Sequence, residues 1–277
     1  MLTTTLDGLW ALQVLSGIEV LAPELGLRPH LPSVEHPAMA LTHPVAGQLQ
    51  ASGVIDANGA VDETVLEWLT VLSRRDVAVL VHVHTPDGET PPERILLARF
   101  AQWWVSLERC GSLVRLSGAG TATSEQSAGL LISAQIERLC GQMASAPIKP
   151  VTIDAAGLLA AVKDPASLRS FLLDQKFDGD QIRMLTTAAN ASRSAQASVV
   201  AIQSGAATGP ARSHIDPGAV TIIDTPHGRL VSEQVRRAAK SWMVVSPGSP
   251  ANIASAVLSM LRNLPAQEQW HTYRKVV

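Results

Sequence analysis

Two histidines separated by one valine are the side chains best placed for chemistry in this 277-residue sequence. His82 and His84 lie in the run Val-His-Val-His at the end of an apolar segment. On a β-strand, residues two positions apart point to the same face, so the two imidazoles could begin a metal site. Such a site needs a third ligand, and no cysteine, acidic residue or further histidine stands at a diagnostic spacing. Two half-exposed histidines on an ordinary strand therefore remain the simpler interpretation.

A second candidate for chemistry is the segment Ser-Pro-Gly-Ser-Pro, residues 246–250, which joins an apolar run to a helical pattern. A loop before a helix can hold a phosphate group. This segment lacks the Gly-Lys-Ser/Thr ending of a phosphate loop, and no Gly-x-Gly-x-x-Gly follows a strand. Ser249 can cap the helix, Pro250 suits its first position, and we expect Gly248 to free the turn of Cβ constraints. The sequence predicts a capped turn, and it contains no Gly-x-Ser-x-Gly hydrolase motif.

The composition narrows the function classes, because 46% hydrophobic and 17% charged residues suit a packed globular core. The formal net charge is -2 and no basic run is present, so we expect no nucleic-acid partner. Cys110 and Cys140 fit no zinc or redox motif, which favours a reducing compartment. The N-terminus lacks the basic region of a signal peptide, and no segment reaches the roughly 20 apolar residues of a membrane span. We expect a cytoplasmic protein with no membrane partner, metal or cofactor.

These residues belong to a regular series of expected elements in the first half of the chain. The expected strands are residues 2–6, 77–83, 94–99, 103–108 and 112–117. Asp7 is expected to cap the first helix, and apolar residues follow it at helical spacing. Short turns separate the last three strands, which is typical of an antiparallel meander. A further helix is expected over residues 124–140.

The same order of elements recurs in the second half. Residues 150–162 repeat the opening strand and helix with Asp154 in the place of Asp7, and a helical stretch over 168–190 is expected to break near Phe177. The expected strands are residues 197–203, 219–224, 229–234 and 241–246. This pattern predicts one domain, residues 1–277, made of pseudo-repeat halves 1–147 and 148–277. The fold class is then α+β, with a central, mostly antiparallel sheet and two helical bundles related by pseudo-two-fold symmetry.

Two strands of the second half show little alternation between apolar and polar residues. Residues 199–202 read Val-Val-Ala-Ile and residues 220–223 read Val-Thr-Ile-Ile. Strands of this kind are either buried on both faces or present one face to another protein. The residues alone leave both interpretations open.

An ordered set of features near the C-terminus is typical of one family. A strand ending in aspartate is followed by a short turn and Gly-Arg, and an aromatic strand then leads to Pro-Gly-Ser, an apolar helix ending in Leu-Pro and a late tryptophan. The residues are Asp224, Gly228, Arg229, Trp242, Pro247, Gly248, Ser249, Leu264, Pro265 and Trp270. Together with the opening Thr-Thr-Leu-Asp-Gly-Leu-Trp, they make the chain resemble the EspG family, the cytosolic chaperones associated with mycobacterial ESX (type VII) secretion systems.

The resemblance implies a non-catalytic chaperone that binds a PE–PPE heterodimer and keeps it soluble until secretion. In the family, the apolar helical tip of the PPE protein docks against the sheet face and the C-terminal bundle. The resemblance thereby implies partner-binding residues on the strands at 197–203 and 220–225. They are Ser198, Val200, Ile202, Val220, Thr221 and Ile223.

Two other functions stay open on the residues alone. The chain could be a structural subunit that forms a weak homodimer through a sheet edge. It could also be a metal- or small-molecule-dependent enzyme that uses His82 and His84. The loop at residues 85–93 contains three prolines and a glycine and is expected to be mobile.

Overall fold

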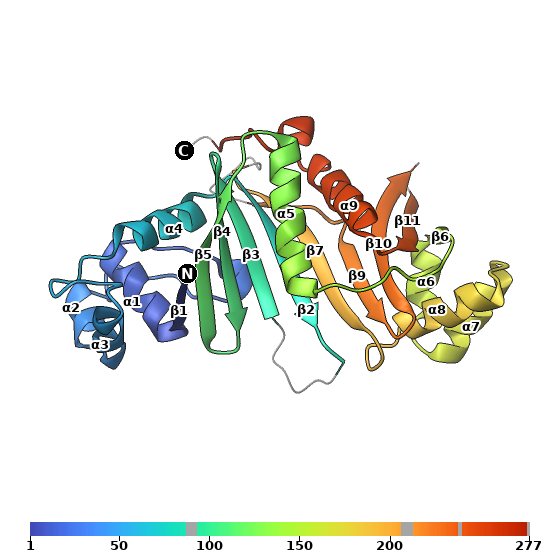
Figure 1. The fold of residues 1–277 in the computed structure, drawn as a ribbon, viewed down its shortest axis with the longest axis horizontal. Helices are drawn as coiled ribbons and strands as arrows, with labels where there is room; N and C mark the ends of the chain where they lie inside the picture. Colours follow the sequence, from blue (N-terminus) through green and yellow to red (C-terminus); the bar gives the residue numbers. More distant parts are fainter. Residues whose placement is uncertain (87–92, 206–212, 238–239, 276–277) are drawn as a thin grey trace.

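The computed structural model describes residues 1–86, 93–205, 213–237 and 240–275. Within these residues, eleven strands form one antiparallel sheet and nine α-helices pack against it (Figure 1). This confirms the predicted α+β class and the antiparallel sheet. Residues 87–92 of the proline-rich loop lie outside the described residues, so the prediction for that loop stays untested. Among the described residues, no helix combines the length and apolar character that crossing a bilayer requires.

The boundaries of the elements follow the predicted ranges closely. The strands are β1 (Leu2–Thr5), β2 (Val77–His84), β3 (Glu93–Phe100), β4 (Trp103–Cys110), β5 (Leu113–Thr121), β6 (Val151–Asp154), β7 (Ala195–Gln203), β8 (His214–Ile215), β9 (Val220–Thr225), β10 (Gly228–Arg237) and β11 (Lys240–Pro247). The helices are α1 (Leu6–Ser16), α2 (Pro37–Thr42), α3 (Pro44–Ala51), α4 (Glu63–Arg74), α5 (Glu125–Cys140), α6 (Ala155–Ala161), α7 (Pro165–Asp174), α8 (Gly179–Ala188) and α9 (Pro250–Arg262), with short 3-10 helices η1 (Pro23–Leu25) and η2 (Gln267–Gln269).

The strand order across the sheet is β1-β5-β4-β3-β2-β7-β9-β10-β11-β6, with β8 paired to β7. The first five strands of the chain fill one side of the sheet, and the later strands fill the other. The two sides meet at the antiparallel pair β2–β7, where Leu80 lies opposite Val200. One continuous sheet therefore joins both parts of the chain, and no linker separates them.

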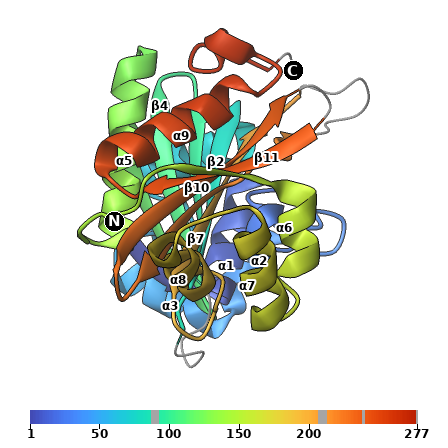
Figure 2. The same ribbon diagram turned by 90° about the vertical axis from the view of Figure 1, so that its right-hand side faces the viewer.

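One face of this sheet is covered along its centre by α5 and α9 (Figures 1 and 2). The buried residues of α9 recur at intervals of three and four, the spacing of a single helix face. They are Ile253, Ala256, Val257, Met260 and Leu261. They share one buried cluster with Ile132 of α5 and with Val199 and Val220 of the sheet. This covered face is hydrophobic core.

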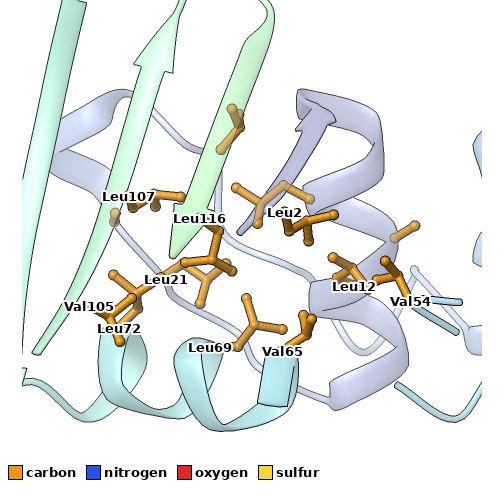
Figure 3. Close-up of a cluster of buried hydrophobic side chains, with 14 of the residues drawn as sticks. Leu2, Leu12, Leu21, Val54, Val65, Leu69, Leu72, Val105, Leu107 and Leu116 are labelled. Carbon is orange, nitrogen blue, oxygen red and sulfur yellow. The ribbon is translucent and has the colours of Figure 1, made fainter. Parts of the chain in front are cut away.

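The opposite face carries a helical cluster at each end, and α1–α4 form the first of them. Its core is drawn in Figure 3, where Leu69 and Leu72 of α4 share one buried cluster with Leu107 of β4 and Leu116 of β5. The Asp62 carboxylate caps α4 at its start. Burial of each leucine contributes about 1.5–3 kcal/mol, so these contacts hold α4 firmly against the sheet.

The second helical cluster consists of α6, α7 and α8 at the other end of the same face (Figure 2). Leu172 of α7 packs in one buried cluster with Leu230 of β10. The helical stretch breaks between α7 and α8, as predicted near Phe177. Asp178 and Gln181 cap the start of α8 reciprocally, each side chain accepting from the other residue's backbone amide. This capping box fixes where the new helix begins.

The helix caps show one difference from the sequence prediction. Thr5, not Asp7, caps α1, and its hydroxyl accepts a hydrogen bond of 3.2 Å from the Gly8 amide. The reason is that β1 runs directly into the helix, which leaves Asp7 within the first turn, where its charge favours the helix dipole. In the second half, Asp154 caps α6 as predicted and accepts from the Gly157 amide at 3.0 Å.

The turn before α9 is capped as predicted, but Gly248 is needed for another reason than the expected one. Ser249 accepts a hydrogen bond of 3.2 Å from the Asn252 amide, and Pro250 opens the helix. Gly248 is not among the glycines with positive φ. A Cβ at this position would lie 2.8 Å from the backbone of Arg229, so close approach of two chain segments excludes a side chain here.

Candidate partner-binding site

The centre of the sheet face between the two helical clusters is partly exposed. We call five residues there the central strip: Leu80, His82, Ser198, Val200 and Thr221. Ser198 lies opposite His82 on β2 and opposite Thr221 on β9, and Val200 lies opposite Leu80. His82 is exposed and the other four are half-buried. The strip contains no Asp, Glu, Lys or Arg side chain. It can therefore contact an apolar surface of another protein that has few hydrogen-bonding groups.

A cavity of about 220 Å³ adjoins the central strip on the side of α6–α8, and we call it the C-terminal pocket. Thr221 and Ile223 of β9 and Met243 of β11 line it from the sheet. Leu158 of α6 and Leu185 of α8 line it from the helices. Most of the remaining lining is also apolar. A concave, mainly apolar surface with a few polar groups is typical of binding sites.

The helices beside this pocket also expose large apolar side chains. Leu159 on α6 is 76% exposed, and Leu173 on α7 is 54% exposed. Val162 lines the pocket and is itself 39% exposed. Isolated exposed leucines are common, but an exposed apolar residue in the lining of an apolar cavity, such as Val162, is typical of an interaction surface. The C-terminal cluster therefore offers apolar contacts both inside the pocket and around it.

The structure brings together four of the six residues predicted to bind a partner. Those on the partly exposed face are Ser198, Val200, Thr221 and Ile223. Ile202 points to the same face, but it is only 1% exposed and belongs to the core beneath α1–α4. Val220 points the other way and packs among the residues beneath α9, with 1% exposure. Side chains alternate along a strand, so Val220 and Thr221 cannot both face the pocket.

The two histidines share one exposed face, as predicted from their spacing. Burial lowers the pKa of His82, and the positive charge of Arg94, opposite it on β3, lowers it further. Within the described residues, no group of three or more His, Cys, Asp and Glu side chains could hold a metal ion. His82 is the exposed polar member of the central strip, and His84 lies two residues further along β2.

The β9–β10 hairpin, which carries Thr221, is held in place by an ion pair. Arg229 binds Asp224 in a bidentate manner, with Nε–Oδ1 and Nη2–Oδ2 distances of 2.6 and 2.7 Å. Arg229 also donates to the carbonyl oxygens of Gly141 and Cys140 at 2.9 and 2.6 Å. The hydrogen bonds with Asp224 raise the pKa of Arg229. The Asp and the Gly-Arg of the sequence pattern therefore serve to position this hairpin against the end of α5.

The motif residues that hold the β9–β10 hairpin led to the expected family, and a comparison with known protein families gives the same one. The sequence pattern that defines the EspG family matches residues 5–258. The chain belongs to the EspG family. The match spans both helical clusters and the whole sheet except the first residues of β1, so the resemblance drawn from the two ends of the sequence is confirmed.

Two relatives place this EspG protein among the ESX secretion-associated proteins. It is 50% identical over 280 residues to the ESX-2 secretion-associated protein EspG2 of Mycobacterium tuberculosis H37Rv, covering 100% of both chains. It is 28% identical over 310 residues to the ESX-5 secretion-associated protein EspG5 of the same strain, covering 99% of this chain and 97% of EspG5. The family is non-catalytic, so His82 and His84 do not define an enzyme active site.

A solved structure shares the fold of this EspG protein. It is that of the Mycobacterium tuberculosis type VII secretion system chaperone EspG5 in complex with a PE25–PPE41 dimer. The TM-score is 0.77 at 24% identity, and the match covers 98% of this chain and 99% of that one. The likeness establishes the common architecture of sheet and helices.

Sequence reasoning missed the pocket residues that come from the helices and from β11. Leu158, Leu185 and Met243 are far apart in the chain and meet only through packing on the sheet. No signal in a short segment could have found them, because adjacent apolar residues of a helix, such as Leu158 and Leu159 of α6, can both belong to one buried face.

Proposed function

We propose that this EspG protein is a cytoplasmic chaperone for a PE–PPE heterodimer and keeps it soluble for type VII secretion. The observation that carries the proposal is the C-terminal pocket, an apolar cavity that opens beside the central strip and among exposed leucines. The related chaperone EspG5, whose structure was solved in complex with a PE25–PPE41 dimer, supports the same function.

The pocket suits the end of an amphipathic helix. Recognition of such a helix places its apolar residues in a hydrophobic groove, and polar groups at the rim fix its orientation. Leu158 and Leu185 can contact apolar side chains of the PPE tip from one wall, and Ile223 can do so from the other. Gln196, which also lines the pocket, can bond a free backbone group at the end of that helix.

The predicted partner-binding residues divide into two roles in this proposal. Ser198, Val200, Thr221 and Ile223 contact the PPE protein directly, since they lie on the partly exposed face. Ile202 and Val220 act from the core, because each is only 1% exposed and fixes the strand that carries the contact residues. A replacement at Val220 would therefore reduce binding through the fold and not through a lost contact.

We further infer that the single domain, residues 1–277, arose from two pseudo-repeat halves, 1–147 and 148–277. From edge to centre, the strand order is β1-β5-β4-β3-β2 on one side and β6-β11-β10-β9-β7 on the other, which supports this inference. In each half, the first strand lies at the edge and the last strand of the meander lies beside it. An experimental structure whose halves fail to superpose strand by strand would rule the duplication out.

The alternative of a dimer joined through a sheet edge is less well supported. The two edge strands, β1 and β6, have only four residues each. Very short edge strands are a common means of preventing edge-to-edge pairing. Sedimentation over a wide concentration range tests this alternative, because a dimer through either edge requires a mass that rises with concentration.

Co-expression tests the proposed function. The candidate partners are PE–PPE pairs encoded beside the gene for this chain, each produced with and without it. We expect the PPE protein to become soluble only when the chain is present, and to co-purify with it. If every such pair remains insoluble, or is equally soluble alone, the chaperone function is wrong.

A further inference from the structure

A second groove is lined by α4 and strands β3–β5. Figure 1 shows α4 at the opposite end of the sheet from α6–α8, which border the C-terminal pocket. The second groove has a volume of about 750 Å³, and we call it the α4 groove. Trp68 contributes to its wall from α4, and Phe100 and Trp103 contribute from the sheet. Grooves of this size accommodate small ligands or short peptide segments.

The groove is open because β5 carries a glycine where it passes α4. Gly118 lines the groove and has no side chain to fill it, whereas a Cβ on Gly120 would meet Leu131 of α5. A Cβ on Gly118 would lie 3.0 Å from Nε1 of Trp68, so even an alanine would intrude on the space. Trp103 is 53% exposed at the groove, which is unusual for the largest apolar side chain. The open floor and the exposed ring together leave a wide aromatic surface without a cover.

The rim of the groove is acidic. Glu63 and Glu67 line it from α4 and lie four residues apart, so they face the same way. Both are exposed, and neither forms an ion pair with a residue in the described part of the chain. Aromatic faces attract cations, and carboxylates at the rim add to the attraction. The charge of the groove is therefore complementary to a basic group.

One ring of the groove already accepts an arginine of this chain. Cζ of Arg274 lies 4.5 Å from the centroid of Phe100. Arg274 is held there by the buried carboxylate of Asp76, which lies 3.1 Å from its Nε and 3.9 Å from Nη2 of Arg99. The Glu63 and Glu67 carboxylates are left for an external cation. Trp68 and Trp103 could hold that cation as Phe100 holds Arg274.

We propose that the α4 groove binds a short amphipathic, basic segment of a second protein. Its apolar side chains lie on Trp68 and Trp103, and its lysine or arginine side chains pair with Glu63 and Glu67. The groove is lined by none of the residues of the C-terminal pocket. A PE–PPE pair and the basic segment can therefore bind the chain at the same time. A substitution can abolish binding at one site and leave binding at the other unchanged.

Isothermal titration with a defined probe tests this site. The probe is an acetylated, amidated peptide of three Leu-Arg repeats, and the comparison peptide has three Leu-Glu repeats. We expect saturable binding of the basic peptide and none of the acidic one, with affinity falling as salt is raised. If the full-length protein shows no saturable binding of the basic peptide below about 1 mM, or binds both peptides alike, the proposal is wrong.

Variants assign the binding to the groove. Glu63→Gln with Glu67→Gln should weaken the basic peptide about five- to tenfold, since exposed pairs contribute little each. Trp103→Ala should weaken it about tenfold or more, as loss of an aromatic anchor does. The matched control, Glu19→Gln with Asp174→Asn, removes the same charge from other exposed positions and should leave affinity unchanged. If the two double variants weaken peptide binding equally, the peptide is attracted by the net charge of the protein alone, and the proposed site is wrong.

Self-association is the competing explanation for the exposed ring. If Trp103→Ala abolishes a concentration-dependent dimer and the peptide does not bind, a second copy covers the groove and the proposal is wrong. The groove variants should still solubilise the PE–PPE pair. A loss of that activity in a folded Glu63→Gln, Glu67→Gln protein would contradict the independence of the two sites.

Discussion

Ser198 lies directly opposite Thr221 in the antiparallel pair β7–β9, and both side chains are half-buried on the face between the two helical clusters. Neither residue is charged, and Thr221 also lines the C-terminal pocket. This pair therefore joins the central strip to the pocket. A partner that covers both the strip and the pocket contacts this pair.

Added bulk at Thr221 should block the partner without unfolding the chain. In Thr221→Tyr, the ring extends into the pocket or over the strip, where the PPE tip packs in the proposed complex. We expect a melting temperature close to that of the unchanged protein and loss of the PE–PPE complex on size exclusion. Thr3→Tyr is the matched control, because Thr3 is an exposed strand threonine at the far edge of the sheet. An unfolded Thr221→Tyr protein, or one that binds normally, would contradict the placement of the interface.

Much of the fold could be predicted from local signals in the sequence. Ser249 with Pro250, and the break near Phe177, follow from capping chemistry that needs only neighbouring residues. The orientation of strand side chains was harder to predict. Val220 and Thr221 lie in a run without polar alternation, so nothing local shows which of them faces α9 and which faces the pocket. The pocket itself depends on how α6 and α8 pack on β9 and β11, which is information that short segments do not contain.

Gly248 should be intolerant of any side chain. A Cβ in Gly248→Ala would approach the backbone of Arg229 to 2.8 Å and displace the residue that binds Asp224. We expect destabilisation of about 1–3 kcal/mol, as for other overpacked sites, measured by urea unfolding. Gly47→Ala is the matched control, because a Cβ there meets nothing within 4 Å in the helix α3. It should stabilise the chain by about 0.4–1 kcal/mol. Equal stability of the two variants would refute the contact argument.

The carboxylate of Glu35 should make stability depend on pH in the acid range. The Leu31 amide is the main cause that lowers its pKa from 4.5 to about 2, with His30 and Arg28 adding to the effect. Because the folded-state pKa is lowered, this stabilisation is complete above about pH 4.5 and is lost as the pH falls toward 2.

The Glu35→Gln variant tests that dependence. It should be less stable than the unchanged protein at pH 7, by about 1–3 kcal/mol, because the buried His30 and the half-buried Trp10 lose a charged acceptor. The difference in unfolding free energy between the two proteins should shrink between pH 4.5 and pH 2. Glu19→Gln, at an exposed position, serves as the control and should show neither effect. A constant difference across this range would mean that Glu35 does not titrate as described.

Cys140 should react slowly with alkylating reagents in the folded protein. Burial raises the pKa of its thiol to about 11, so little thiolate is present near pH 8. Mass spectrometry of iodoacetamide-treated protein follows this residue by its own peptide. We expect labelling at Cys140 to accelerate at least tenfold when urea unfolds the chain, which returns the thiol to its ordinary pKa. Equally fast labelling of the folded chain would show that the thiol is accessible and ionised.

The central claim is that the face carrying Thr221 binds a PE–PPE heterodimer. The most direct measurement is the mass, by light scattering during size exclusion, of the chain mixed with the PE–PPE pair encoded beside its gene. We expect one peak with the mass of one copy of each of the three proteins, and two separate peaks when Thr221→Tyr replaces the unchanged chain. Separate peaks for the unchanged chain with every such pair, or an intact complex with Thr221→Tyr, would contradict it.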